Sequence, residues 1–185
     1  MTTDLPCSAE QFARTRHAGH VRKYTGEPYT VHLREVAELV ASVGGDPVQV
    51  AAAWLHDVVE DTATTIEEVR AAFGDDVGDL VADLTDISQP SDGNRQARKA
   101  LDRDHLAAAP ARSQTIKLAD LISNTQSIAA HDPGFARVYL AEKRALLDVL
   151  VHGDATLHAL VSMDIDFDPP VAIYGSSSIH VGLNA

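Results

Sequence analysis

The segment AAAWLHDVVEDT, residues 51–62, places ionisable side chains inside an otherwise apolar run. His56 and Asp57 interrupt the apolar residues, and a second acidic pair, Glu60 and Asp61, follows one turn later. Burying an ionisable group is costly unless a partner of opposite charge or a hydrogen bond compensates it. The segment therefore predicts a buried site whose partners come from elsewhere in the chain.

Helical periodicity continues on both sides of this segment. Ser8, with Gln11 three residues later, resembles a capping box that opens a helix. Asp46 and Pro47 supply an N-cap and a first-turn proline for the helix that carries residues 51–62. Apolar spacing and stop signals together predict helices over residues 8–20, 29–43, 47–62, 65–73, 76–87, 95–109, 112–130, 135–152 and 156–162.

The end of the chain differs in character from these helices. VAIYGSSSIHVGLNA, residues 171–185, has two short apolar runs around Gly-Ser-Ser-Ser. These runs could pair as a short β-hairpin or form a disordered tail, and the pattern leaves both open. We expect an all-α, single-domain helical bundle over residues 8–162, followed by a C-terminal tail over residues 163–185.

The composition restricts the classes of function. The chain of 185 residues carries a net charge of −12, so nucleic-acid binding is not expected as its main activity. No apolar run approaches the roughly 18 residues that a membrane span requires. Cys7 is the only cysteine, and the first residues lack a basic region followed by an apolar stretch. These features predict a cytoplasmic protein without disulfides or a membrane partner.

Three of the expected helices carry an imidazole or a carboxylate on the apolar face. His32 precedes apolar side chains by four, seven and eleven residues, and Asp120 lies among the apolar residues of TIKLADLISNTQSIA. With His56 and Asp57, these residues make a set of two histidines and two aspartates that suits a divalent ion. A single buried histidine is more often a hydrogen-bonded core residue. The presence of four such groups on three helices favours a metal site.

Glu60 and Asp61 extend this pattern. Glu60 follows His56 by four residues, and Asp61 follows Asp57 by four, so each lies one turn from a candidate ligand. A carboxylate at that distance can orient a water molecule or accept its proton. The alternative interpretation is an acidic helix end that faces solvent, and the spacing does not decide between the two.

These motifs together resemble a known family. The order of His32, HDVVEDT and KLADLISN resembles the HD superfamily of metal-dependent phosphohydrolases. RKYTGEPYTVH, the segment from residue 51 to residue 74, VGDLVADLTD and IKLADLISN are more closely similar to the hydrolase domain of RelA/SpoT-type alarmone enzymes. The resemblance covers roughly residues 8–150.

This resemblance implies a helical HD-type hydrolase that binds one Mn²⁺ ion, although other divalent metals suit the same ligands. The enzyme would remove pyrophosphate from the 3′ position of guanosine tetra- or pentaphosphate and leave GDP or GTP. The resemblance assigns the metal ligands to His32, His56, Asp57 and Asp120, and the activation or positioning of water to Glu60 and Asp61. Substrate contacts are expected from Arg22, Lys23, Lys117 and Asn124. The chain is also too short for the synthetase and regulatory domains of the long enzymes, which implies a stand-alone small alarmone hydrolase.

The chain departs from the family pattern at a few positions. The long enzymes usually read ADRLHN where this chain reads ADLISN, so Leu121 and Ser123 replace a basic residue and a histidine. Tyr24 occupies a loop position where a small or charged residue is more usual. A phosphohydrolase acting on another 2′- or 3′-phosphorylated nucleotide, or a non-catalytic nucleotide-binding HD domain, remains as an alternative. The helical surfaces and the tail could also support a homodimer.

Overall fold

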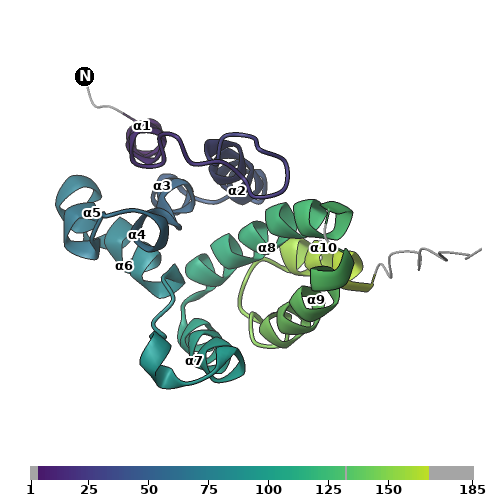
Figure 1. Cartoon of the computed structure of the whole chain (residues 1–185). Coiled ribbons are helices and arrows are strands. Elements are labelled where there is room, and N and C mark those ends of the chain that lie inside the picture. The colour runs from purple at the N-terminus through teal and green to yellow at the C-terminus, as the bar shows by residue number, and fades with distance from the viewer. Residues whose placement is uncertain (1–3, 132, 167–185) are drawn as a thin grey trace, which may run out of the picture.

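The computed structural model describes residues 4–131 and 133–166 of the chain, and this part is built of helices and short connections (Figure 1). The helices are α1 (Leu5–Arg16), α2 (Thr30–Ser42), α3 (Pro47–Leu55), α4 (Val58–Asp61), α5 (Ile66–Phe73), α6 (Asp75–Leu84), η1 (Pro90–Asp92), α7 (Arg95–Ala108), α8 (Ala111–His131), α9 (Pro133–Leu147) and α10 (Ala155–Asp166). The expected all-α fold is confirmed. Among these residues, β-type pairing is limited to one isolated antiparallel bridge between Val21 and Pro28.

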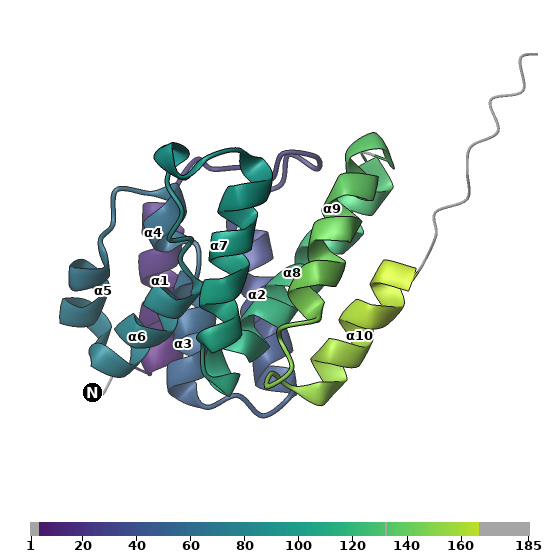
Figure 2. The same cartoon turned by 90° about the horizontal axis from the view of Figure 1, so that it is seen from below.

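Helix α8 runs through the middle of the bundle (Figure 1). Helices α2, α3 and α6 pack against one part of it, and α9 and α10 pack against another. Figure 2 shows α9 and α10 side by side at one end of the molecule, with α1 and α5 at the opposite end. The inward side chains of α2, α3 and α8 are fully buried, as Leu33, Leu55 and Leu118 illustrate. The three helices that were expected to carry polar site residues therefore share one core.

The expected continuous helix over residues 47–62 is interrupted at its two polar residues. Helix α3 ends at Leu55, His56 and Asp57 form a turn, and α4 begins at Val58. In a regular helix, consecutive side chains point about 100° apart around the axis. The turn brings His56 Nε2 and Asp57 Oδ2 to 3.0 Å from each other. The interruption therefore allows two neighbouring residues to face the same point.

The start of α1 also differs from the prediction. The helix begins at Leu5 after Asp4, and Ser8 lies inside it, where its hydroxyl donates to the carbonyl of Asp4 at 3.3 Å. The predicted capping box at Ser8 is wrong because Pro6 suits the first turn of the helix and allows it to begin earlier.

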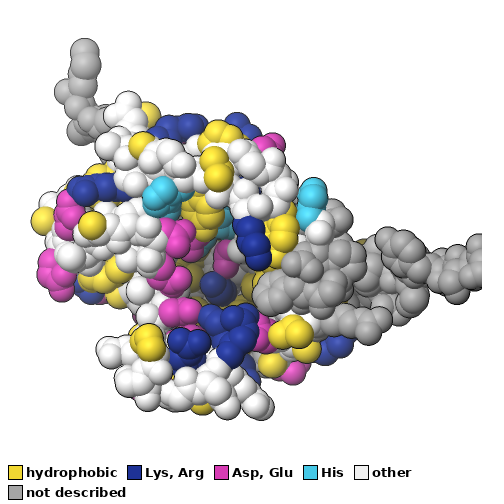
Figure 3. All heavy atoms as spheres, in the orientation of Figure 1, with side chains coloured by type: hydrophobic (Ala, Val, Ile, Leu, Met, Phe, Trp, Pro, Cys, Tyr) yellow, Lys and Arg dark blue, Asp and Glu magenta, His cyan; other side chains and the backbone are white. Residues whose placement is uncertain are grey.

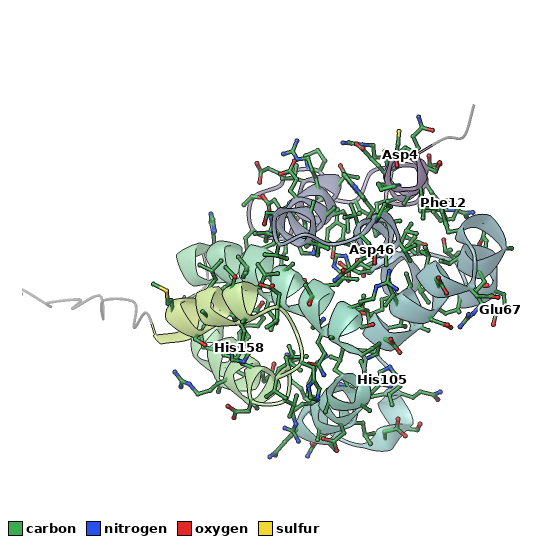
Figure 4. The ribbon with its side chains drawn as sticks, turned by 180° about the vertical axis from the view of Figure 1, so that it is seen from behind. Asp4, Phe12, Asp46, Glu67, His105 and His158 are labelled. Carbon is green, nitrogen blue, oxygen red and sulfur yellow. The ribbon has the colours of Figure 1, made fainter. Side chains whose placement is uncertain are left out.

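The predicted cap of α3 is confirmed, and it also connects two helices. Asp46, labelled in Figure 4, accepts hydrogen bonds from the backbone N–H groups of Val48 and Gln49, each at 2.9 Å. Its Oδ1 atom also accepts from Arg112 Nη2 on α8 at 2.7 Å. The cap thus fixes the beginning of α3 relative to α8, which helps to place the His56–Asp57 turn at the other end of α3.

The structure describes only part of the segment for which a C-terminal tail was predicted. Helix α10 extends to Asp166, and the segment in which a hairpin or a disordered tail was expected, residues 167–185, lies outside the described residues. Over residues 4–131 and 133–166, none of the helices combines the length and the apolar character that crossing a membrane requires.

The residue that follows α1, His17, has a buried imidazole ring. His17 is 1% exposed, and its ring stacks on that of Tyr29 with 5.1 Å between the centroids. Its Nε2 atom has no hydrogen-bond partner in the described part of the chain. Burial lowers the pKa of His17 from 6.5 to about 4, although the negative charge of Asp57 opposes this shift. The folded protein therefore keeps this side chain neutral at mildly acidic pH.

We predict that His17 makes the fold less stable as the pH falls. Because its folded pKa lies below its unfolded value, the unfolded chain binds more protons, and the free energy of unfolding drops as the pH falls from about 6.5 toward 4. Between pH 7 and pH 5, protonation of His17 in the unfolded chain lowers the free energy of unfolding by about 2 kcal/mol. Chemical denaturation at the two pH values should show a smaller loss for His17→Phe than for the wild type. The control is His152→Asn, which removes an exposed histidine from the connection between α9 and α10 and should leave the loss as large as in the wild type. Equal losses for wild type and His17→Phe would contradict the prediction.

Candidate active site

Four side chains from α2, the α3–α4 turn and α8 converge on one point. His32, His56 and Asp57 each direct a potential ligand atom to this point, and these atoms lie within 4.8 Å of one another. The Nε2 atoms of His32 and His56 are 3.3 Å apart. Asp120 adds its Oδ1 atom, 3.4 Å from His32 Nε2 and 3.8 Å from His56 Nε2. The structure thus brings together all four residues that the sequence singled out as ligands.

Both imidazole rings turn the same nitrogen toward this point. His56 Nδ1 lies 2.8 Å from the backbone carbonyl of Ala53, and His32 Nδ1 lies 2.8 Å from the hydroxyl of Ser123. A carbonyl oxygen only accepts hydrogen bonds, so His56 must carry a proton on Nδ1. In its neutral form, His56 therefore directs a bare Nε2 lone pair at the carboxylates and at the second ring.

The electrostatics of the cluster require positive charge. Burial disfavours a charged His56, but Asp57 and Asp120 raise its pKa well above the usual value. Burial also opposes ionisation of Asp57, yet the nearby histidines hold its pKa well below the usual range. In the absence of another cation, protons supply the positive charge. Two imidazole nitrogens and two carboxylates are also a donor set that first-row divalent metals accept, so the residues fit such an ion.

Each carboxylate of the cluster has its own supporting contacts. Tyr29 donates its hydroxyl to Asp57 Oδ2 at 2.5 Å. Asn124 donates its amide to Asp120 Oδ1 at 2.6 Å, and Lys117 Nζ lies 2.9 Å from Asp120 Oδ2. Burial lowers the pKa of Lys117, but the charge of Asp120 raises it above its usual value, so Lys117 stays cationic. These contacts hold both carboxylates ionised and oriented.

Glu60 and Asp61 lie on α4, directly beyond the His56–Asp57 turn. Glu60 Oε1 accepts a hydrogen bond from the backbone N–H of Asp86 at 2.7 Å. Glu60 is exposed at the surface of the helix, yet the partial loss of hydration of its carboxyl group raises its pKa to about 7. Partial burial and the charge of Asp57 also raise the pKa of Asp61. A carboxyl group with a pKa near neutrality can exchange protons efficiently at physiological pH.

A cavity of about 690 Å³ opens beside Asp120 between α7, α8 and α9. Figure 3 shows Lys and Arg side chains gathered over α7, next to Asp and Glu side chains, at this hollow. The basic residues that line the cavity are Arg95, Lys99, Arg103, Lys117 and Lys143. Asn124 contributes to the wall, and Leu121 and Tyr139 make part of it apolar. This arrangement can hold an anionic group and a less polar group within reach of Asp120.

The other expected substrate contacts, Arg22 and Lys23, are not among the residues that line this cavity. Arg22 is buried, and its guanidinium donates to Glu35 Oε2 at 3.0 Å and to the carbonyl of Ser123 at 2.9 Å. Lys23 is exposed and lies 4.9 Å above the ring of Tyr24. A substrate contact for Arg22 and Lys23 remains a prediction, and the structure gives Arg22 a role inside the protein.

Sequence reasoning missed several residues that support the site. Tyr29 carries a usable signal because it precedes His32 by three residues, which places both at the start of one helix. Glu35 and Ser123 lie 88 residues apart, and their contact arises only when α2 packs on α8. No spacing in the sequence could have linked them.

Comparisons with known proteins agree with this geometry. A family model described as "HD domain" matches residues 9–147. A Synechocystis protein named "Probable guanosine-3′,5′-bis(diphosphate) 3′-pyrophosphohydrolase" is 38% identical over 132 residues, which cover 70% of this chain but only 17% of that protein. The Xenopus tropicalis protein "Guanosine-3′,5′-bis(diphosphate) 3′-pyrophosphohydrolase MESH1" is 34% identical over 132 residues, covering 70% of this chain and 72% of the relative.

A solved structure supports the same relationship. It is described as "A metazoan ortholog of SpoT hydrolyzes ppGpp and plays a role in starvation responses", and it superposes with a TM-score of 0.79 at 28% sequence identity. The superposition covers 89% of this chain and 95% of the other. Because the family model spans most of the chain and contains all four converging side chains, the chain belongs to the HD domain family and is related to the guanosine-3′,5′-bis(diphosphate) 3′-pyrophosphohydrolases.

Proposed function

We propose that this HD domain hydrolyses guanosine 3′,5′-bis(diphosphate) with the help of a divalent ion, with Mn²⁺ as the expected metal. The reaction adds water across the bond between the 3′ oxygen and its diphosphate, and releases pyrophosphate and guanosine 5′-diphosphate. The observation that carries the proposal is the convergence of two histidines and two aspartates beside a cavity lined with basic residues. The names of the relatives supply the substrate class.

The metal would be held by His32, His56, Asp57 and Asp120. When bound, the ion would neutralise phosphate charge and lower the pKa of a coordinated water molecule. The protein's contribution is to hold these four groups in place before the ion arrives. Tyr29 restrains Asp57 and Asn124 restrains Asp120, so the ligands need little reorganisation.

Glu60 is the group best suited to accept a proton during hydrolysis. It lies one turn beyond His56, and its pKa of about 7 matches the requirement of a base that works near neutral pH. The backbone N–H of Asp86 holds its Oε1 atom, and within the described part of the chain no hydrogen bond occupies Oε2, which could contact water. Asp61, on the same short helix, would help to position that water.

In this proposal, the cavity beside Asp120 would supply the substrate contacts. Lys117 stays cationic there, and Asn124 lines the same wall. Anionic phosphates in the cavity would meet Lys117 and the basic residues of α7. The exposed side chain of Lys23 would contact the nucleotide from the loop before α2.

We predict that purified protein releases pyrophosphate from the alarmone when Mn²⁺ is supplied, and that chelation abolishes this release. Asp57→Asn should lose both metal binding and turnover, because it removes a charge that faces two imidazole nitrogens. The loss of metal affinity and of turnover should exceed the roughly 10- to 100-fold effect of removing a hydrogen bond that supports a metal ligand. The surface variant Asp79→Asn is the matched control and should retain both properties. Full turnover with a chelator present would refute the metal mechanism.

The choice of substrate needs a separate measurement. The protein should turn over guanosine tetraphosphate faster than a panel of other 2′- and 3′-phosphorylated nucleotides at equal concentration. A higher kcat/KM for one of those nucleotides would assign the domain to that substrate instead.

We further predict that Glu60→Gln retains the metal but lowers kcat by about 10²- to 10⁴-fold, since an amide cannot accept the proton. Calorimetric titration with Mn²⁺ and steady-state kinetics on the same preparation separate the two effects. Glu67→Gln on α5 removes an equal charge from the surface and should leave kcat unchanged. A wild-type kcat for Glu60→Gln would remove Glu60 from the mechanism.

A further inference from the structure

The two histidines of the cluster are anchored in different ways. His56 Nδ1 contacts the backbone carbonyl of Ala53 in the preceding helix α3, whereas His32 Nδ1 contacts the side chain of Ser123 on α8 at 2.8 Å. The hydroxyl of Ser123 in turn donates to Glu35 Oε2 on α2 at 2.5 Å. The orientation of His32 therefore depends on a side-chain relay, and that of His56 does not.

The chemistry of this relay determines where the proton of His32 resides. The hydroxyl of Ser123 has one hydrogen, and an ionised carboxylate can only accept a hydrogen bond. Because Ser123 gives its hydrogen to Glu35, its oxygen can only accept from the ring of His32. His32 must then carry a proton on Nδ1, which leaves Nε2 bare in the neutral ring and directed at Asp57 and Asp120.

Arg22 contacts two members of the relay, Glu35 and Ser123. Its guanidinium donates through Nη1 to Glu35 Oε2 at 3.0 Å and through Nη2 to the backbone carbonyl of Ser123 at 2.9 Å. Because a guanidinium can only donate, Glu35 Oε2 accepts hydrogen bonds from both Arg22 and Ser123. The Arg22 side chain is 9% exposed, whereas that of Glu35 is 40% exposed, so the relay runs from the buried cluster toward solvent.

We propose that Ser123 and Glu35 are positioning residues that hold His32 as its Nδ1–H tautomer and thereby set the affinity of the site for a divalent ion. The inference rests on the metal site of the proposed function. It also gives a physical role to a position where ADLISN departs from the pattern of the long alarmone enzymes. The relay ties the loop before α2, α2 itself and α8 to one ligand.

The first test measures the affinity for Mn²⁺ by calorimetric titration. Ser123→Ala removes the acceptor of His32 and should weaken Mn²⁺ binding by about 10- to 100-fold. Ser123→Thr keeps the hydroxyl and should bind with an affinity close to that of the wild type. Ser113→Ala is the matched control, because Ser113 is a buried serine of the same helix that donates to Asp83 at 2.7 Å, and it should leave the affinity unchanged.

A double-mutant cycle separates a relay from two independent structural contributions. Glu35→Gln introduces an amide that can donate as well as accept, so the hydrogen of Ser123 is no longer directed away from His32. This variant alone should weaken Mn²⁺ binding. In the Ser123→Ala background the same substitution should have no further effect, since the relay is already broken. Additive losses would overturn the proposal.

A third measurement observes the proton itself and needs neither metal nor turnover. In ¹⁵N-labelled, metal-free protein at alkaline pH, where the imidazole is neutral, the ring proton of His32 should reside on Nδ1. Ser123→Ala should shift it toward a mixture of tautomers. A wild-type proton on Nε2, or wild-type Mn²⁺ affinity in Ser123→Ala, would overturn the relay. If the relay behaves as expected but the alarmone is not hydrolysed, the proposed function fails and the relay stands.

Discussion

The structure depends on the mutual approach of two imidazole nitrogens and two carboxylates in the interior of a helical bundle. His32 Nε2 and His56 Nε2 lie 3.3 Å apart, with carboxylate oxygens of Asp57 and Asp120 between 3.0 and 3.8 Å from them. At these distances inside a protein, such groups are stable together only when a cation, either a proton or a metal ion, shares their charge. Because burying these charged groups together costs free energy, many hydrogen bonds and ion pairs around the cluster support it.

Those supports come from separate parts of the chain. Tyr29 holds Asp57 from the start of α2, Lys117 and Asn124 hold Asp120 from within α8, and Ser123 holds His32 from α8 across to α2. Since each candidate ligand is restrained by a contact outside the cluster, these contacts oppose its movement away from the others. Such contacts favour one arrangement of these side chains before any ion binds, as catalysis by preorganised electrostatics requires.

The cavity beside the cluster explains how an acidic protein could accept the anionic substrate that we propose. The chain carries a net charge of −12, yet basic residues gather where α7, α8 and α9 meet. Several of them already have acidic partners: Arg95 pairs with Glu142, and Lys99 pairs with Asp86. A phosphate must therefore compete with these carboxylates, which favours ligands that carry several charges over those that carry one.

The helical class and the polar residues of the site could be predicted from the sequence, because periodicity and burial cost are local properties of the chain. His32, HDVVED and Asp120 stood out since each places a costly group on an apolar face. The break between α3 and α4 could not be read in this way, because neither His56 nor Asp57 is a residue type that ends helices. The tertiary structure decided that the four candidate ligands meet, that Arg22 pairs with Glu35, and that Ser123 contacts His32. These contacts join residues far apart along the chain, and only the packing of α2, α3 and α8 determines which of them come within hydrogen-bond distance.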